Sequence, residues 1–132
     1  MTFVNREAET AYDWCNPLLT DMYQIKMTYA EWKAKRHDEQ CVFEMFFRKL
    51  PFKGNFAIMA GMDEVLRFLE SYKFSEEHIN YLRSVITQCE DEFWEYLRNL
   101  DCKGIKVSGA VDGEMVFPDQ PLLRLEGPFS LL

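Results

Sequence analysis

Histidine is scarce in this sequence of 132 residues, and cysteine is never closely paired. The two histidines, His37 and His78, lie 41 residues apart, and no Cys-x-x-Cys pair occurs among the cysteines, which are Cys15, Cys41, Cys89 and Cys102. A zinc site usually needs such a pair or histidines at ligand spacing. The sequence therefore predicts no metal site and four reduced, mostly buried cysteines.

Long apolar runs and an excess of basic residues are also absent. The longest uncharged apolar run, residues 56–62, is far shorter than the roughly 20 residues that a membrane helix needs. The amino terminus has no basic-then-apolar signal peptide. With 15 basic and 22 acidic residues, the net charge of -7 argues against a nucleic-acid-binding surface. We therefore expect a soluble, cytosolic, acidic domain with no nucleic-acid or membrane partner.

Apolar residues make up 48% of the sequence and aromatic residues 15%, enough for one domain with a packed core. The charges are unevenly distributed along the chain. Residues 63–95 hold nine acidic and three basic residues, a pattern typical of a solvated helical face. Residues 31–53 hold six basic and four acidic residues, so an anion-binding surface is expected before residue 54.

A first helix is predicted from Asn16-Pro17 or Thr20 to about Lys35, because Pro at the first helical position loses no needed hydrogen bond. One apolar stripe at helical spacing holds Leu18, Met22, Ile25, Tyr29 and Trp32. A second apolar side holds Leu19, Tyr23, Met27 and Ala30. A helix that is apolar over more than half its circumference should be covered on two sides, which favours a second protein surface.

The following pattern predicts an α+β fold with an N-terminal helix, a β-hairpin, a helical segment and C-terminal antiparallel strands. The hairpin would pair a strand at 41–48 with one at 56–60, through a turn at 51–55. Three helices follow, one with the Met62–Leu69 stripe, one capped by Ser75 and one starting at Asp91. The last strands are expected at 105–111, 114–117 and 122–126, with turns at Asp112-Gly113 and 118–121.

The domain is expected to cover 16–132, after a flexible arm at 1–15. Its ending, Phe129-Ser-Leu-Leu132, is apolar, whereas chain ends are normally solvated. The ending either docks as the last piece of the core or marks a chain cut short in mid-fold, and the pattern favours the second reading.

Three residues are candidates for binding. Tyr23 offers a flat ring for stacking, and Asp21 either bonds a ligand or simply favours the helix amino terminus. Arg48 ends a strand beside Lys49, and its guanidinium suits bidentate phosphate contact, although it could equally shield Phe46. No Ser-His-Asp set, glycine-rich phosphate loop or cysteine nucleophile appears. The residues alone thus indicate an anion site near Arg48.

Several motifs resemble nicotinate phosphoribosyltransferases in order and spacing over about residues 15–132. They are Asn16-Pro-Leu-Leu-Thr-Asp-Met-Tyr-Gln24, Phe43-Glu-Met-Phe-Phe-Arg-Lys49 with Pro51-Phe-x-Gly-x-Phe and Ala60-Gly61, Glu64–Glu70, Tyr96-Leu-Arg, Val116-Phe-Pro118 and Leu122-Leu-x-x-Glu-Gly-Pro128. This family makes nicotinate mononucleotide and pyrophosphate from nicotinate and phosphoribosyl pyrophosphate, with ATP hydrolysis, in NAD salvage. The resemblance implies that phosphoribosyl transfer is coupled to ATP hydrolysis, which places the enzyme in the ligase class. It implies no tightly bound cofactor, with ATP as a co-substrate and Mg²⁺ as a candidate metal ion of the full-length enzyme.

The same resemblance implies roles for the three candidates. Tyr23 matches the aromatic residue that stacks on the pyridine ring, Asp21 the acidic residue beside the base in related nicotinamide-using enzymes, and Arg48 the arginine that reaches the phosphates. In the family these residues serve a site shared across a dimer. The barrel and the phosphorylated histidine lie beyond residue 132, so no catalytic residue is expected within this chain, and alone it should be inactive. The alternatives are a non-catalytic module that pairs with full-length subunits and an unstable fragment.

Overall fold

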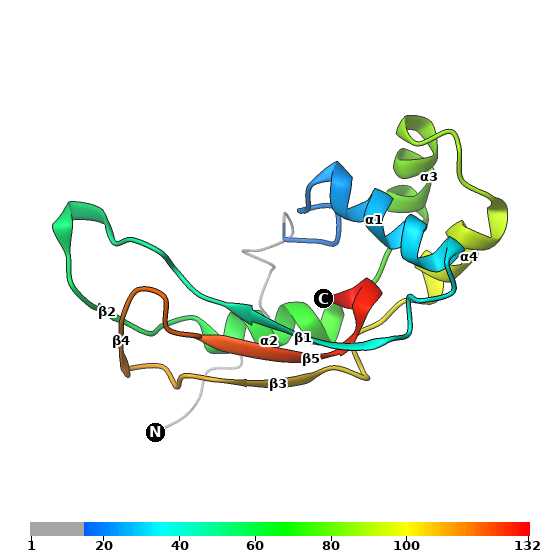
Figure 1. Cartoon of the computed structure of the whole chain (residues 1–132). Coiled ribbons are helices and arrows are strands. Elements are labelled where there is room, and N and C mark those ends of the chain that lie inside the picture. Colours follow the sequence, from blue (N-terminus) through cyan, green and yellow to red (C-terminus); the bar gives the residue numbers. More distant parts are fainter. Residues whose placement is uncertain (1–14) are drawn as a thin grey trace, which may run out of the picture.

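The computed structural model describes residues 15–132, so the predicted arm lies, except for Cys15, outside the described residues. The expected α+β class is confirmed (Figure 1). The helices are α1 (Met22–Lys33), α2 (Met62–Ser71), α3 (Glu76–Val85) and α4 (Asp91–Asn99), with two short 3-10 helices, η1 (Pro51–Lys53) and η2 (Phe129–Leu131). The strands are β1 (Gln40–Met45), β2 (Ala57–Ile58), β3 (Lys106–Gly109), β4 (Met115–Val116) and β5 (Leu123–Pro128).

The predicted helix starts are largely confirmed. Ser75 caps α3, and its Oγ accepts a hydrogen bond of 3.2 Å from the backbone N–H of His78. α4 begins at Asp91, which places acidic residues in the first turn, where the helix dipole favours them. α1 ends close to the expected Lys35, whose φ of 58° lies in the left-handed region that stops a helix.

The core lies among α1, α3 and α4, at one end of the molecule (Figure 1). Ile79 and Phe93 are completely buried and Leu97 nearly so. Phe74, which directly precedes the N-cap of α3, is buried in the same cluster as Ile79 and so forms a hydrophobic staple at the start of this helix. Three amphipathic helices meeting at one place thus account for most of the buried apolar surface.

The predicted hairpin between the first two strands is wrong. β1 pairs antiparallel with β5 over six residues, β3 pairs with the other edge of β5, and β2 pairs instead with β4. Because backbone N–H and C=O groups need partners, the long register against β5 satisfies β1 far better than the two-residue β2 could. The last strands are antiparallel as expected, but consecutive strands do not pair.

The turn at Asp112-Gly113 connects the β2–β4 ribbon to α2. Gly113 has a φ of 95°, and its N–H donates to the Met59 carbonyl at 2.8 Å. The Asp112 carboxylate accepts hydrogen bonds from the backbone N–H groups of Gly61 and Met62, at 3.3 and 3.1 Å, and so caps α2. One turn therefore closes the ribbon and starts a helix distant in sequence.

The apolar ending forms η2 and packs against α1. The Phe129 N–H donates to the Glu39 carbonyl at 2.9 Å, and Ser130 Oγ lies 2.5 Å from the Tyr96 hydroxyl. None of the helices within residues 15–132 has the length and apolar character needed to cross a membrane.

Candidate functional site

The segment before α1 is a turn, not the helix start that Asn16-Pro17 suggested. The Asn16 carbonyl accepts from the Leu19 N–H and the Asn16 Oδ1 from the Leu18 N–H, both at 2.9 Å, as in an Asx turn. The helix begins at Met22, close to the alternative start at Thr20. Asp21 is its N-cap with extended backbone, φ −81° and ψ 143°, and forms a capping box with Gln24. Asp21 therefore has a structural role at the helix start.

The rest of α1 is held by the helical core. Ile25 is buried, and the Tyr29 ring centroid lies 5.0 Å from that of Phe93. The Tyr29 hydroxyl donates to Glu90 Oε2 at 2.6 Å, while Lys33 forms a hydrogen-bonded ion pair with Glu90 Oε1. Hydrogen bonds from Lys33 and then Tyr29 lower the pKa of Glu90 to about 2, and the bond to Glu90 raises the pKa of Tyr29 to about 12. These contacts fix the position of the helix.

Tyr23 borders a small open hollow. The hollow has a volume of about 240 Å³ and is lined by the start of α1, by Phe43 of β1, by Tyr72 and by residues 129–132. Drug-sized ligands generally occupy about 300–1,000 Å³, so this space suits a single small ring. The Tyr23 side chain is 58% exposed, and no other aromatic ring within residues 15–132 stacks on it. Its face is therefore available to a flat ligand.

The second apolar side of α1 is uncovered by the described residues. Leu19, in the turn before α1, is 61% exposed, and Met27, one turn after Tyr23 in the helix, is 49% exposed. Within residues 15–132, other parts of the chain thus cover the core side of the helix and leave its second apolar side exposed.

Arg48 lies in a bend after β1, three residues beyond the strand end at Met45, and not at the strand end as predicted. It borders a second, more open hollow of about 590 Å³ together with Glu44, Met45, Phe46 and Lys49. Neither Arg48 nor Lys49 forms an ion pair with any residue in 15–132. The two unpaired cations remain available to an anionic group.

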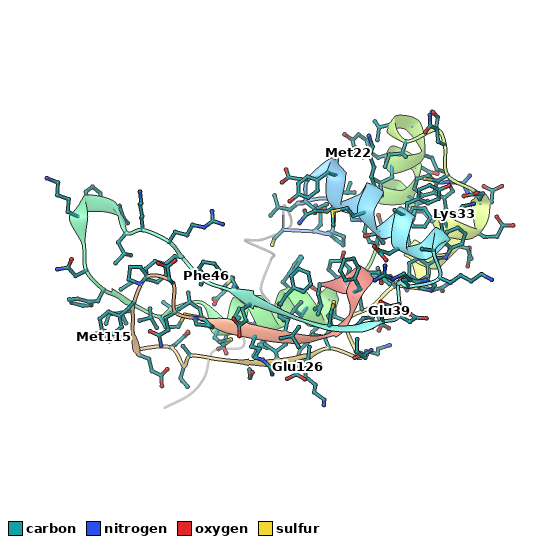
Figure 2. The ribbon with its side chains drawn as sticks, in the orientation of Figure 1. Met22, Lys33, Glu39, Phe46, Met115 and Glu126 are labelled. Carbon is teal, nitrogen blue, oxygen red and sulfur yellow. The ribbon has the colours of Figure 1, made fainter. Side chains whose placement is uncertain are left out.

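Of the three candidates, only Tyr23 lines the first hollow, whereas Asp21 caps the helix two residues earlier and Arg48 lines the second hollow. The two hollows share no lining residue. In Figure 2, Met22, the neighbour of Tyr23, lies on the upper helix, whereas Phe46, near Arg48, lies where the chain leaves the sheet. A ligand that fills only the hollow beside Tyr23 would therefore not contact Arg48.

The cysteines and histidines of the described part of the chain form neither a disulfide nor a metal-binding group. All four cysteines are free and half-buried, so burial is less complete than predicted. Burial raises the pKa of Cys102 to about 11, which keeps its thiol protonated at neutral pH. His37 packs its ring against Tyr96, with centroids 4.9 Å apart. Within residues 15–132, no group of three His, Cys, Asp or Glu side chains could hold a metal ion, including Mg²⁺.

Sequence reasoning missed three lining residues of the hollow beside Tyr23. Phe43 and Phe129 meet edge to face, with centroids 6.2 Å apart, although they are 86 positions apart in sequence. Only the pairing of β1 with β5 brings them together. Gln24, in contrast, had a local signal, because an acidic residue followed three positions later by Gln is the spacing of a capping box.

Comparisons with known proteins identify the family of this chain. The family model described as the nicotinate phosphoribosyltransferase N-terminal domain matches residues 18–132. Nicotinate phosphoribosyltransferase 1 of Arabidopsis thaliana is 45% identical over 88% of this chain and 21% of its own length. The nicotinate phosphoribosyltransferase of Mus musculus is 42% identical over 88% of this chain and 22% of its own length.

A solved structure is similar as well. The crystal structure of human nicotinic acid phosphoribosyltransferase matches 84% of this chain and 22% of that chain, with a TM-score of 0.76 and 38% identity. The chain thus spans about a fifth of the length of the relatives it matches. By this match over 18–132, the chain belongs to the family of nicotinate phosphoribosyltransferase N-terminal domains.

Proposed function

We propose that this chain is the amino-terminal part of a nicotinate phosphoribosyltransferase, which transfers a phosphoribosyl group to nicotinate in NAD salvage. The observation that carries the proposal is the exposed Tyr23 ring beside a hollow of single-ring size, in a chain that belongs to this family. Nicotinate is a flat pyridine ring with a carboxylate. In this proposal Tyr23 stacks on the ring, and Asp21 lies beside it while also capping the helix.

Arg48 receives the phosphates of phosphoribosyl pyrophosphate in this proposal. Its guanidinium and the neighbouring Lys49 are exposed and free of ion pairs with residues 15–132. Because its hollow is separate from that of Tyr23, the proposal requires further groups, from the rest of the enzyme or a second subunit, to bring base and phosphates together. We infer a dimer with a shared site, since the uncovered side of α1 carries Tyr23 itself.

Chemical transfer needs more than this segment offers. Stabilising an electron-poor sugar and a departing pyrophosphate requires several preorganised donors, and one arginine supplies too few. We accordingly assign ATP coupling to the remaining four fifths of the full-length protein. This coupling would make the enzyme a ligase, and we place the enzyme in the cytosol. No step is assigned to Mg²⁺ on residues 15–132, because no group of ligands there suits it.

The stacking role is tested in the full-length enzyme that carries this segment. Tyr23→Ala should weaken nicotinate affinity by roughly tenfold or more, because it removes both stacking and buried area. Tyr23→Phe should have a much smaller effect, since the ring remains. Equilibrium binding of nicotinate is the measurement. Equal losses in both variants would contradict stacking and indicate that the hydroxyl matters.

The phosphate role has a parallel test. Arg48→Ala should raise the KM for phosphoribosyl pyrophosphate and leave nicotinate affinity nearly unchanged. Arg48→Lys should recover only part of the loss, because lysine lacks the planar fork. An Arg48→Ala enzyme with an unchanged KM for phosphoribosyl pyrophosphate would remove Arg48 from the proposed site.

Subunit mixing tests the shared site. A subunit with Tyr23→Ala is combined with one damaged only beyond residue 132, each nearly inactive alone. If the site is shared, the mixed dimer regains one intact site and measurable activity. Proven subunit exchange with activity still at baseline would refute the shared arrangement.

The second candidate, a non-catalytic module that pairs with full-length subunits, is favoured by the separation of Tyr23 from Arg48 within this segment. Purified 132-residue protein should show no nicotinate-dependent release of pyrophosphate under either candidate. Adding it to full-length enzyme distinguishes them, because only a module of this kind would change the rate through mixed assemblies.

A further inference from the structure

Gln24 connects the chain before α1 to the first turn of the helix. Its Oε1 accepts a hydrogen bond of 2.9 Å from the backbone N–H of Asp21 and a short one from the hydroxyl of Thr20. Because the Asp21 N–H can only donate, the amide atom that faces it is the oxygen. An amide oxygen has two acceptor positions, and both are used here. The backbone N–H of Gln24 in turn donates a hydrogen bond to the Asp21 backbone carbonyl at 2.9 Å.

The position of Tyr23 depends on this first turn. The residues of α1 itself that pack in the core, Ile25, Tyr29 and Trp32, all follow Tyr23 in the chain, and Leu18, in the turn before the helix, packs against the same cluster. Tyr23 itself is mostly exposed, and no ring in 15–132 stacks on it. The first four N–H groups of a helix lack partners within the helix, so its first turn frays unless side chains hold it. At this helix start, the capping box formed by Asp21 and Gln24 does so, and Gln24 accepts the hydrogen bond from the Asp21 N–H.

We propose that Gln24 is a positioning residue for capture of the pyridine base. Its side-chain oxygen accepts hydrogen bonds from both Thr20 and Asp21 and so holds the first turn of α1. This turn places the Tyr23 ring at the edge of the hollow, which Gln24 also lines. It acts through Asp21 and Tyr23. This inference rests on the proposed function, since it concerns how the same site captures nicotinate.

The test compares variants of the full-length enzyme that carries this segment. Gln24→Ala should raise the KM for nicotinate about three- to tenfold, the effect expected when a helix cap of ordinary strength is lost. The kcat and the KM for phosphoribosyl pyrophosphate should stay within about twofold. Gln24→Glu should restore most of the nicotinate KM, because a carboxylate accepts the same two hydrogen bonds and suits a helix amino terminus.

The matched control is Gln40→Ala, an identical substitution at an exposed position whose side chain reaches only the Asp38 carbonyl, at 3.5 Å. It should leave all three kinetic constants unchanged. Hydrogen exchange of the Asp21 amide provides a readout independent of catalysis and should accelerate in Gln24→Ala but not in Gln24→Glu.

The outcomes separate this inference from the proposed function. A wild-type enzyme without nicotinate-dependent turnover would overturn both. An active wild type in which Gln24→Ala behaves like Gln40→Ala would overturn the positioning role alone. A variant with a lower kcat, higher KM values for both substrates and lower thermal stability would also overturn it, because such a result would indicate a general structural role.

Discussion

The two ends of the molecule contain similar apolar residues but bury them to very different degrees (Figure 1). At the helical end, Phe93 is completely buried and Leu97 is 1% exposed. At the other end, around η1 and the β2–β4 ribbon, Phe52 is 100% exposed, Ile58 54% and Met115 53%. Apolar character alone therefore does not determine burial in this chain.

The difference lies in how many layers meet at each end. α1, α3 and α4 pack on one another, so each apolar stripe faces another one. The ribbon pairs two residues of β2 with two of β4, and a ribbon of this size has little face of its own to bury. Only Met59 and Val116 are buried there. The helical end is a core, and the ribbon is an apolar surface.

The largest expected effect comes from the same substitution made at both ends. Phe93→Ala should lower the free energy of unfolding by about 3–5 kcal/mol, a large part of the roughly 5–15 kcal/mol that a domain has. Phe52→Ala should change it by less than about 0.5 kcal/mol, because no packing is lost. Denaturant unfolding measures both. Similar losses of stability in the two variants would contradict the conclusion that only the helical end forms a core.

Next in size is a steric test at the edge of the sheet. A Cβ on Gly109 would lie 2.3 Å from the Leu122 carbonyl oxygen and 2.8 Å from Leu123 Cδ2. Gly109→Ala should therefore destabilise the chain by about 1–3 kcal/mol, as overpacking does. Gly104→Ala meets nothing within 4 Å and should be neutral or slightly stabilising. If Gly109→Ala left thermal unfolding unchanged, β3 would not pack on β5 as described.

A smaller effect is expected from pH, at the helical end only. The hydrogen bonds from Lys33 and Tyr29 lower the pKa of Glu90 from 4.5 to about 2 in the folded chain. A carboxyl whose folded pKa is depressed stabilises the fold above its unfolded pKa, and this contribution is lost as pH falls from about 4.5 to about 2. Glu90→Gln should flatten the loss of thermal stability over that range. An unchanged pH profile would mean that the Glu90 cluster does not contribute.

The smallest effect on stability should come from the ribbon surface. Ile58→Thr combined with Met115→Thr should change the free energy of unfolding by less than about 0.5 kcal/mol, since both side chains are about half exposed. The same pair should reduce self-association and the binding of an apolar dye, because it removes exposed apolar area. Light scattering and dye fluorescence measure this. A marked drop in stability would show that the ribbon is also part of the core.

The starts of α1 and α3 depend on neighbouring residues, whereas the start of α2 is capped by Asp112, which lies 50 positions after Met62. Ser75 caps α3 through a bond to a residue three positions away, and the Asp21–Gln24 box spans the same distance. Such contacts depend on sequence spacing alone, because a helix turn brings residues three and four apart together. The candidate Tyr23 could be predicted for the same reason, since its place in the first turn is local.

The strand partners could not be predicted in this way. The residues of β1 pair with residues of β5 that lie 78 to 88 positions later, and β2 bonds to β4 instead of to its neighbour in sequence. The separation of Arg48 from Tyr23, and the presence of Phe43 and Phe129 beside Tyr23, follow from those pairings.

The sequence by itself therefore determined the α+β class, the starts of α3 and α4 and the candidate residues, because short-range hydrogen bonds and apolar periodicity depend on residues that are close together in sequence. Only the tertiary structure decided which strands pair, which apolar faces are buried and which candidates line a hollow. Those outcomes depend on competition among distant segments for the same backbone hydrogen bonds and the same apolar surface, and no local pattern records the result of that competition.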